Sequence, residues 1–292
     1  NDFLHEYIRL DLPARELKIT IAKDRTYIAD VYLFSAGELP DWVEVWEKPW
    51  DKADILFFST HSDDEVLFFG GLIPTYTDKG YNVQVAYFCN FAEAEPYRRH
   101  EQLSGIWTMG VDHYPQLGIF DDIPLVLNTT EVSEEEREES FASFDTEEGM
   151  EYVVSTIRRF KPMVLVAQDC NNGEYGHGAH IVCSQLVADA AEVSGDASKY
   201  PESESQYGVW DVPKTYLHLY PENQITVDAR VPLNKFGGKT AFDIAEEAYL
   251  KHESQQWMWF YVTDCAPEDN RGLNCTIFGD HRGREYNSGS NP

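Results

Sequence analysis

The sequence is poor in basic residues and has no long apolar run. It contains 51 acidic residues but only 23 Lys and Arg, which gives a formal net charge of −28 at pH 7. A field of that sign repels the phosphates of nucleic acids and anionic membrane surfaces, so we expect no nucleic-acid partner. No apolar stretch approaches the roughly 20 residues that a membrane-spanning helix needs. We therefore expect no membrane span.

Cysteine is also scarce. The five cysteines are Cys89, Cys170, Cys183, Cys265 and Cys275. They are too scattered for a disulfide scaffold or a zinc ribbon built from paired CxxC motifs, so cysteine is not the expected metal ligand. Cys265 and Cys275 could form a local bridge in an exported protein, and five free, mostly buried thiols are the alternative.

The chain begins at Asn1 rather than Met, as a trimmed or a signal-processed chain would. We favour a secreted or cell-surface location over a cytoplasmic one, and the oligomeric state stays open.

Several catalytic signatures are missing. The sequence has no GxSxG, HExxH or GxxxxGK[ST] motif, and a serine or cysteine hydrolase has no support. The stretch Gly173-Glu-Tyr-Gly176 is rich in glycine, but it precedes histidines rather than forming a phosphate-binding fingerprint.

Hydrophobic residues make up 42% of the chain, enough for one sizeable core. Residues 1–50 carry short β-branched and aromatic runs interrupted by charge, which predicts a small β-rich N-terminal segment. Trp42, Trp46 and Trp50 recur in it every four residues. We expect them to pin the segment onto the main domain, and a sugar-stacking stripe is the alternative.

The main domain, residues 51–292, alternates apolar strand patterns with amphipathic helix patterns. We predict strands over 54–59, 83–89 and 163–167, and helices from the region after 59 to Lys79, over 98–109, over 147–160 and over 179–193. This order predicts an α/β fold: a Rossmann-like, mostly parallel sheet with flanking helices. The acidic stretch 131–140 predicts a solvated loop or surface helix, with Ser133 and Glu136 at capping-box spacing. The C-terminal extension of this domain stays unassigned.

Two clusters of potential ligands follow predicted strands. His61-Ser-Asp-Asp-Glu65 comes directly after the first strand, and Gly176-His-Gly-Ala-His180 comes after the third. Because ligands bind beyond the carboxyl ends of strands in an open α/β sheet, both clusters are expected at one site. A divalent metal is the simplest neutraliser of so many carboxylates, since it accepts imidazole nitrogen and carboxylate oxygen together.

These motifs resemble those of the PIG-L/LmbE family of zinc-dependent N-acetylglucosaminyl de-N-acetylases. His61-Ser-Asp-Asp-Glu65 resembles the family's His-Pro-Asp-Asp-Glu, and His177-Gly-Ala-His180 its His-x-x-His. Arg98-Arg-His-Glu101 is similar to its Arg-x-x-Glu helix, and His252-Glu-Ser-Gln255 to its late His-x-Ser-Gln. The resemblance covers about residues 51–256, and Ser62 departs from it where the family has Pro.

The resemblance implies a role for each matched residue. His61, Asp64 and His180 would bind one zinc ion per chain, although another divalent metal could take its place. Asp63 would be the general base and His177 would stabilise the oxyanion. Arg98 and Glu101 would help to hold the substrate. Apart from the resemblance, we expect Glu65 to cap the next helix or to support a ligand from outside the metal's own ligand set.

The chemistry of these groups is consistent with the implied roles. Two imidazoles and one carboxylate leave a zinc coordination position open, as a catalytic site requires. Asp63 is then suited to accept a proton, and a protonated His177 to stabilise the developing negative charge.

The expected function is zinc-dependent removal of the N-acetyl group from an amino sugar of the N-acetylglucosamine type, in a glycan or glycoconjugate, with release of acetate. The negative net charge favours a neutral substrate. A catalytically idle carbohydrate-binding protein of the same fold is one alternative, and a metal-dependent amidase acting on another small conjugate is a second. The particular sugar and its aglycone stay open.

Overall fold

The structure is a computed structural model of the chain. It describes residues 5–11, 14–21, 28, 30–91, 95–123, 125 and 131–256, together with the backbone of residues 277–280.

A mixed sheet with the strand order β2-β1-β3-β4-β6-β5 forms the centre of the molecule. The strands are β1 (Ile55–Ser59), β2 (Val83–Tyr87), β3 (Val164–Ala167), β4 (Lys214–His218), β5 (Ile225–Thr226) and β6 (Ile277–Asp280). The first four run parallel, and β6 pairs antiparallel with both β4 and β5. The prediction of a mostly parallel sheet is confirmed.

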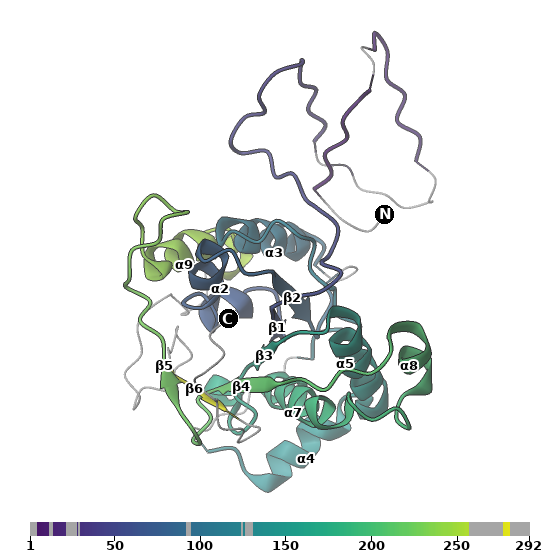
Figure 1. Cartoon of the computed structure of the whole chain (residues 1–292), viewed down its shortest axis with the longest axis vertical. Coiled ribbons are helices and arrows are strands. Elements are labelled where there is room, and N and C mark those ends of the chain that lie inside the picture. The colour runs from purple at the N-terminus through teal and green to yellow at the C-terminus, as the bar shows by residue number, and fades with distance from the viewer. Residues whose placement is uncertain are drawn as a thin grey trace.

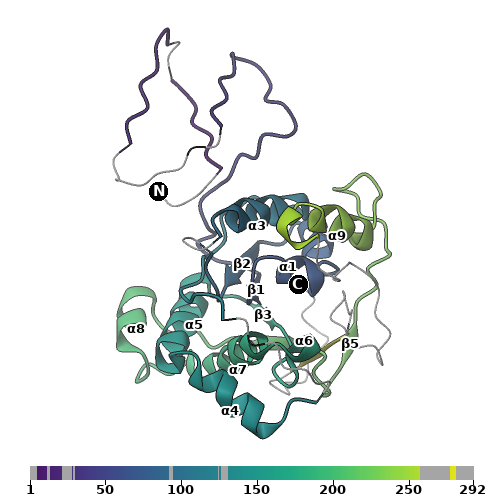
Figure 2. The ribbon, with the colours of Figure 1, turned by 180° about the vertical axis from the view of Figure 1, so that it is seen from behind.

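Helices cover both faces of the sheet (Figures 1 and 2). The helices on one face are α1 (Asp64–Leu67), α2 (Ile73–Asp78), α3 (Tyr97–Thr108) and α9 (Ala241–Tyr249), followed by the short 3₁₀ helix η1 (Glu253–Gln255). Those toward the other face are α4 (Glu134–Ala142), α5 (Thr146–Phe160), α7 (Gly178–Val193) and α8 (Pro201–Tyr207). The short α6 (Gly173–Gly176) connects β3 to α7. The molecule therefore has three layers.

The apolar run of β1 contributes side chains to the hydrophobic cores on both faces of the sheet. Leu56 and Phe58 pack in the core toward α5 and α7, whereas Ile55 and Phe57 pack in the core toward α1, α2 and α9. Successive side chains of a strand point to opposite faces, so a strand with helices on both sides must be apolar at every position. This is why the sequence shows a continuous run here rather than an alternating one.

The order of connections places a crevice between β1 and β3. From β1 the chain passes to β2 on one side, and it later returns to β3 on the other side of β1. The loops that leave the carboxyl ends of β1 and β3 therefore diverge, which is where open α/β sheets bind ligands. Both predicted ligand clusters lie on these two loops.

The predicted helix ending at Lys79 is two short helices, α1 and α2. Gly70 and Gly71 lie between them, and Pro74 stands in the first turn of α2. Glycine is a poor helix former and proline is accommodated only in a first turn, so the chain breaks here. The sequence did not predict β4, β5, β6, α8 or α9.

The predicted surface helix in the acidic stretch is confirmed as α4. Ser133 caps it: its hydroxyl oxygen accepts from the Glu136 N–H, while the Glu136 carboxylate accepts from the Ser133 N–H. The helix exposes most of its carboxylates and has no part in the crevice.

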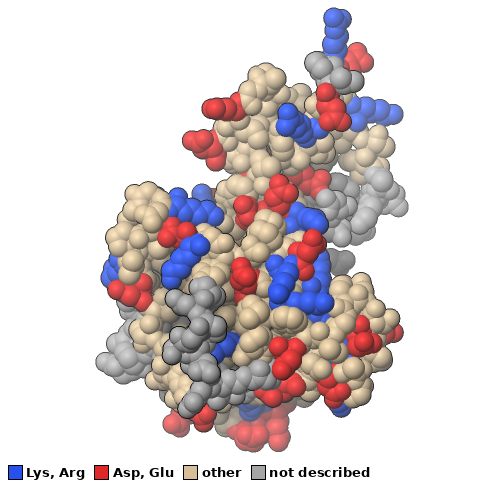
Figure 3. All heavy atoms as spheres, viewed as in Figure 1, with Lys and Arg blue, Asp and Glu red and all other residues tan. Residues whose placement is uncertain are grey.

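The described part of residues 1–50 contains no strand, so its predicted β-rich character is not found there. Only Glu47 makes an isolated bridge, to His113. Figure 3 shows this segment projecting from the body of the molecule. Its exposed apolar side chains include Ile19 and Leu33. A β-branched run becomes a strand only where another strand is available to pair with it.

The three tryptophans of this region differ in their packing. Trp46 stacks on Tyr114 and Trp50 on His113, which confirms that these two pin the segment to the main domain. Trp42 is 60% exposed and contacts Tyr32 and Phe34 of the projecting segment instead.

Cys89, Cys170 and Cys183 are free and buried, whereas Cys265 and Cys275 lie outside the described residues. Among the described helices, none is both long and apolar enough to cross a bilayer.

Substitution by alanine should have different effects on the stability of the fold at two buried glycines, Gly118 and Gly149. A Cβ on Gly118 would lie 2.3 Å from the carbonyl oxygen of Phe88. One on Gly149 in α5 would lie 2.7 Å from the flexible end of Leu186 and at an ordinary contact distance, 3.5 Å, from the ring of Phe120. We expect Gly118→Ala to destabilise the fold by about 1–3 kcal/mol, because the backbone that follows β2 must shift. Gly149→Ala should stay within about 1 kcal/mol of the parent, because the gain in helix propensity offsets the closer packing. Urea unfolding of the two variants measures the difference, and equal losses would contradict it.

Candidate metal centre

Three ligand atoms converge in the crevice between β1 and β3. His61 Nδ1 lies 3.0 Å from Asp64 Oδ2 and 3.1 Å from His180 Nε2, and the last two atoms are 3.1 Å apart. All three residues are at most 5% exposed. Tetrahedral zinc ligands at bond lengths of about 2.0–2.1 Å stand roughly 3.3 Å from one another, so this donor set fits a zinc ion.

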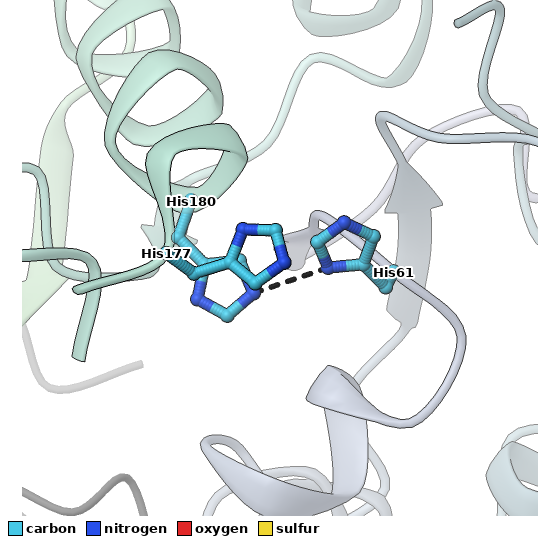
Figure 4. Close-up of side chains that lie close together, drawn as sticks. All are labelled: His61, His177 and His180. Carbon is cyan, nitrogen blue, oxygen red and sulfur yellow. Dashed lines mark hydrogen bonds between the residues drawn. The ribbon is translucent and has the colours of Figure 1, made fainter. Parts of the chain in front are cut away.

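Two other groups of potential ligands share His61. His61, His177 and His180 offer nitrogen atoms that all lie within 4.8 Å of one another, and Figure 4 shows their rings facing a common point. His61, Cys89 and Asp122 form the other group. The three atoms of the set with Asp64 lie within 3.1 Å of one another, and the set combines nitrogen and oxygen donors, as some catalytic zinc sites do.

Each imidazole of this set has a carboxylate behind it. His61 Nε2 lies 2.9 Å from Asp122 Oδ1, and His180 Nδ1 lies 3.0 Å from Glu174 Oε2. A carboxylate that accepts from one ring nitrogen leaves the other nitrogen to face the metal. The sequence analysis missed both carboxylates: Asp122 lies on a loop with no motif, and Glu174 was noted only as part of a glycine-rich turn.

The charges of these groups depend strongly on each other. Burial alone would lower the pKa of His180, but Asp64 and Glu174 raise it to about 9. Burial likewise opposes ionisation of Asp64, yet His180 and His61 hold its pKa well below the usual value. Metal binding must therefore displace a proton from the histidines, as imidazole ligation requires.

Asp63 lies beside the ligand set in a strained backbone conformation, with φ at 119°. Such a conformation is costly for a residue other than glycine, and it persists where neighbouring contacts hold it. Here the Asp63 N–H donates to Glu65 Oε2 at 2.9 Å. Burial, followed by the charge of Asp64, raises the pKa of Asp63 to about 7. A carboxyl group with such a pKa can both accept and return a proton near neutral pH.

Arg98 lies against the Asp63 loop. Its Nη2 donates to the carbonyl oxygen of Ser62 at 2.5 Å and stands 3.5 Å from Asp63 Oδ1, while the guanidinium stacks over Phe91. Arg98 therefore holds the candidate base in place. Its predicted contact with the substrate stays a prediction.

Glu101 on the same helix is engaged by the 3₁₀ helix η1. It accepts from the N–H of Ser254 at 2.7 Å and from the hydroxyl of Ser254 at 2.6 Å. The late His-x-Ser-Gln motif is thus joined to α3. The predicted role of Glu101 in holding the substrate also stays a prediction.

The surroundings of His177 favour the neutral imidazole rather than the protonated one expected from the sequence. Burial, followed by the charges of His180 and His61, holds its pKa well below the ordinary value. Its ring centroid lies 4.6 Å from those of His61 and His180, and its buried Nδ1 has no hydrogen-bond partner among the described residues. A neutral imidazole can still donate one N–H to a substrate oxygen.

Glu65 lies next to the candidate base, and its expected role in capping the next helix or supporting a ligand stays a prediction. Its Oε1 forms an ion pair with His252 Nε2 at 2.9 Å, and both side chains are fully buried. Gly105 makes room for this pair, since a Cβ there would lie 2.6 Å from His252 Nε2. His252, the first residue of the late His-x-Ser-Gln motif, therefore contacts the segment 61–65 that carries the candidate ligands, through Glu65.

The crevice thus combines a set of candidate metal ligands with an adjacent carboxyl group, that of Asp63, whose pKa of about 7 lies near neutrality. This combination is typical of metal-assisted hydrolases.

Comparison with known proteins agrees with this class. Residues 56–191 match the family described as PIG-L, GlcNAc-PI de-N-acetylase. The resemblance to the PIG-L/LmbE family read from the motifs is thereby confirmed, and the match includes both clusters of predicted ligands.

Two relatives are named 1D-myo-inositol 2-acetamido-2-deoxy-alpha-D-glucopyranoside deacetylase. The protein of Catenulispora acidiphila is 26% identical over 66% of this chain and 63% of its own length. That of Mycobacterium leprae is 30% identical over 57% of this chain and 59% of its own length. This chain therefore spans less than two thirds of the length of either relative.

Two solved structures share the fold. N,N'-diacetylchitobiose deacetylase from Pyrococcus horikoshii has a TM-score of 0.51 at 18% identity, covering 72% of this chain and 74% of its own. The conserved protein TT1542 from Thermus thermophilus has a TM-score of 0.51 at 20% identity, covering 70% and 80%. Both confirm the α/β fold.

The competing ligand sets predict different results for two histidines. We expect His180→Ala to weaken zinc binding by more than the ~10–100-fold that outer contacts cost, because it removes a direct ligand. His177→Ala should retain zinc if Asp64 completes the set. Metal content after dialysis against zinc, together with titration against a chromophoric chelator, measures both variants. Equal loss in the two would favour the set of three histidines.

Proposed function

We propose that this chain is a zinc-dependent hydrolase that removes the acetyl group from the nitrogen of an N-acetylated amino sugar. The observation that carries the proposal is the convergence of His61, Asp64 and His180 within 3.1 Å of one another, with Asp63 beside them. The match to the PIG-L family and the deacetylase names of the relatives support it.

The substrate class follows from those relatives. Each is named for deacetylating a 2-acetamido-2-deoxyglucose unit linked to inositol. A glycan or glycoconjugate that carries N-acetylglucosamine is therefore the proposed substrate of this chain, and its aglycone is for experiment to identify.

His61, Asp64 and His180 would hold the zinc ion. When bound, zinc supplies Lewis-acid polarisation of an acetamide carbonyl and lowers the pKa of water. The chain's own groups move the protons. Asp63 is placed to accept a proton from the attacking water and to return it to the leaving amine.

Arg98 keeps the Asp63 loop in position, since it contacts both Ser62 and Asp63. The neutral imidazole of His177 faces the same centre, where one N–H can donate to the oxygen that becomes negative as the amide is attacked. Donors fixed before the reaction are effective because they need not reorganise while the charge develops.

Substitutions at the neighbouring residues Asp63 and Asp64 distinguish the role of general base from the role of metal ligand. Asp63→Asn preserves the ligand set and the shape of the loop, so we expect zinc to stay bound while turnover falls by ~10²–10⁴-fold. Asp64→Asn replaces an anionic ligand with a neutral amide, so we expect it to lose zinc first and activity as a result. Release of acetate from N,N'-diacetylchitobiose and from an N-acetylglucosaminyl-inositol, with zinc content and melting temperature, measures both variants.

Near-normal turnover in Asp63→Asn would remove this residue from the mechanism. Sugar binding by the zinc-loaded parent without acetate release would favour a catalytically idle carbohydrate-binding protein. Release of an acyl group only from non-sugar amides would favour an amidase acting on another small conjugate.

A further inference from the structure

Glu174 is the point where three hydrogen-bond donors meet behind the metal centre. Its Oε2 accepts from His180 Nδ1 at 3.0 Å, and its Oε1 accepts from His218 Nδ1 at 3.2 Å and from the N–H of Asp169 at 2.6 Å. His180 and His218 are fully buried and Glu174 is 2% exposed. The contacts connect the metal-ligand set to the end of β4, on the far side of β3.

The backbone of Glu174 is strained. Its φ and ψ are 60° and −67°, a conformation near the rare γ-turn with positive φ, which a residue with a side chain rarely adopts. Such strain persists only where the surroundings hold it, and it concentrates at functional sites. At Glu174 the three contacts of the carboxylate and the backbone hydrogen bonds of the turn hold this conformation.

We propose that Glu174, itself anchored by His218, is a positioning residue that fixes His180 with Nε2 directed at the metal. The proposal rests on the proposed role of His180 as a ligand. By accepting the Nδ1–H, the carboxylate selects the ring tautomer whose Nε2 lone pair is free. His218 prevents Glu174 from rotating away, because it holds the second carboxylate oxygen.

The ring of His180 has other contacts besides the one with Glu174. Its Nε2 lies 3.1 Å from Asp64 Oδ2, its face stacks on His177, and Phe68 and Tyr175 approach it edge-on with centroids 5.6 and 5.4 Å from its own. The aromatic contacts do not select a tautomer, whereas the bond to Glu174 places the proton on Nδ1.

Glu174→Gln tests the first part of the proposal. A neutral amide offers one acceptor oxygen where three donors converge, so His180 or His218 loses its partner. We expect zinc and cobalt to bind ~10–100-fold more weakly, the range that loss of such an outer contact produces. The visible absorption of the cobalt-loaded protein should also shift, because the ligand field at His180 changes. Chelator competition and absorption spectra of the full chain measure both effects.

Two substitutions of His218 test whether this residue holds Glu174 in place. His218→Leu removes the donor to Glu174 and should weaken metal binding in the same direction, whereas His218→Asn places an amide N–H near the position of Nδ1 and should restore part of it. A role in packing alone predicts the reverse order, since leucine fills the buried site with apolar atoms.

Glu44→Gln is the matched control. Glu44 forms a similar carboxylate–imidazole contact with His5, and its other partners are Trp46 and Ser104. Its loss should leave metal affinity and the cobalt spectrum unchanged.

Parental affinity and spectrum in Glu174→Gln would overturn the inference. If this variant does not fold, as circular dichroism would show, equal metal binding by His218→Leu and His218→Asn would overturn it instead. Failure of the parent chain itself to bind zinc or cobalt would refute the proposed metal site, which is a separate result.

Discussion

The close approach of two histidines and an aspartate at the end of β1 is the constraint on which much of this structure depends. Burying ionisable groups is costly unless each has an opposite partner. The structure meets this condition by pairing three buried imidazoles with carboxylates: Asp122 behind His61, Glu174 behind His180 and Glu65 beside His252. The partners come from separate stretches of the chain, so the site also holds the layers of the molecule in register.

Two residues with a strained backbone lie at the same place. Asp63 and Glu174 both have positive φ, and both follow the strands that border the crevice. One is the candidate base and the other supports a ligand. Each strained turn places an acidic side chain beside the ligand set: Asp63 next to Asp64, and Glu174 against His180. The cost, on the order of 1–3 kcal/mol for each residue, is offset by the hydrogen bonds that hold the two turns.

The N-terminal segment contrasts with this tightly packed centre. Trp46 and Trp50 bind its end to the body of the molecule, and His5 contacts Glu44 and, on α3, His100. Between these anchor points many large apolar side chains stay exposed, including Ile8 and Leu33 at 73% and 75%. The body of the molecule buries its apolar runs because each has a helix or strand to pack against, and the projecting segment has none among the described residues.

The sequence by itself determined the class of fold and the candidate ligands. A strand buried on both faces must be apolar throughout, and ligands follow the carboxyl ends of such strands, so β1, β3 and the clusters around His61 and His180 could be read from local patterns. Spacing alone did not reveal the outer partners. Asp122, Glu174 and His218 belong to no motif, and β4 has a mixed pattern in which only three of five residues are buried. Only the tertiary structure brings them to the ligands, because a hydrogen bond between residues 44 positions apart depends on strand order, which no local pattern encodes.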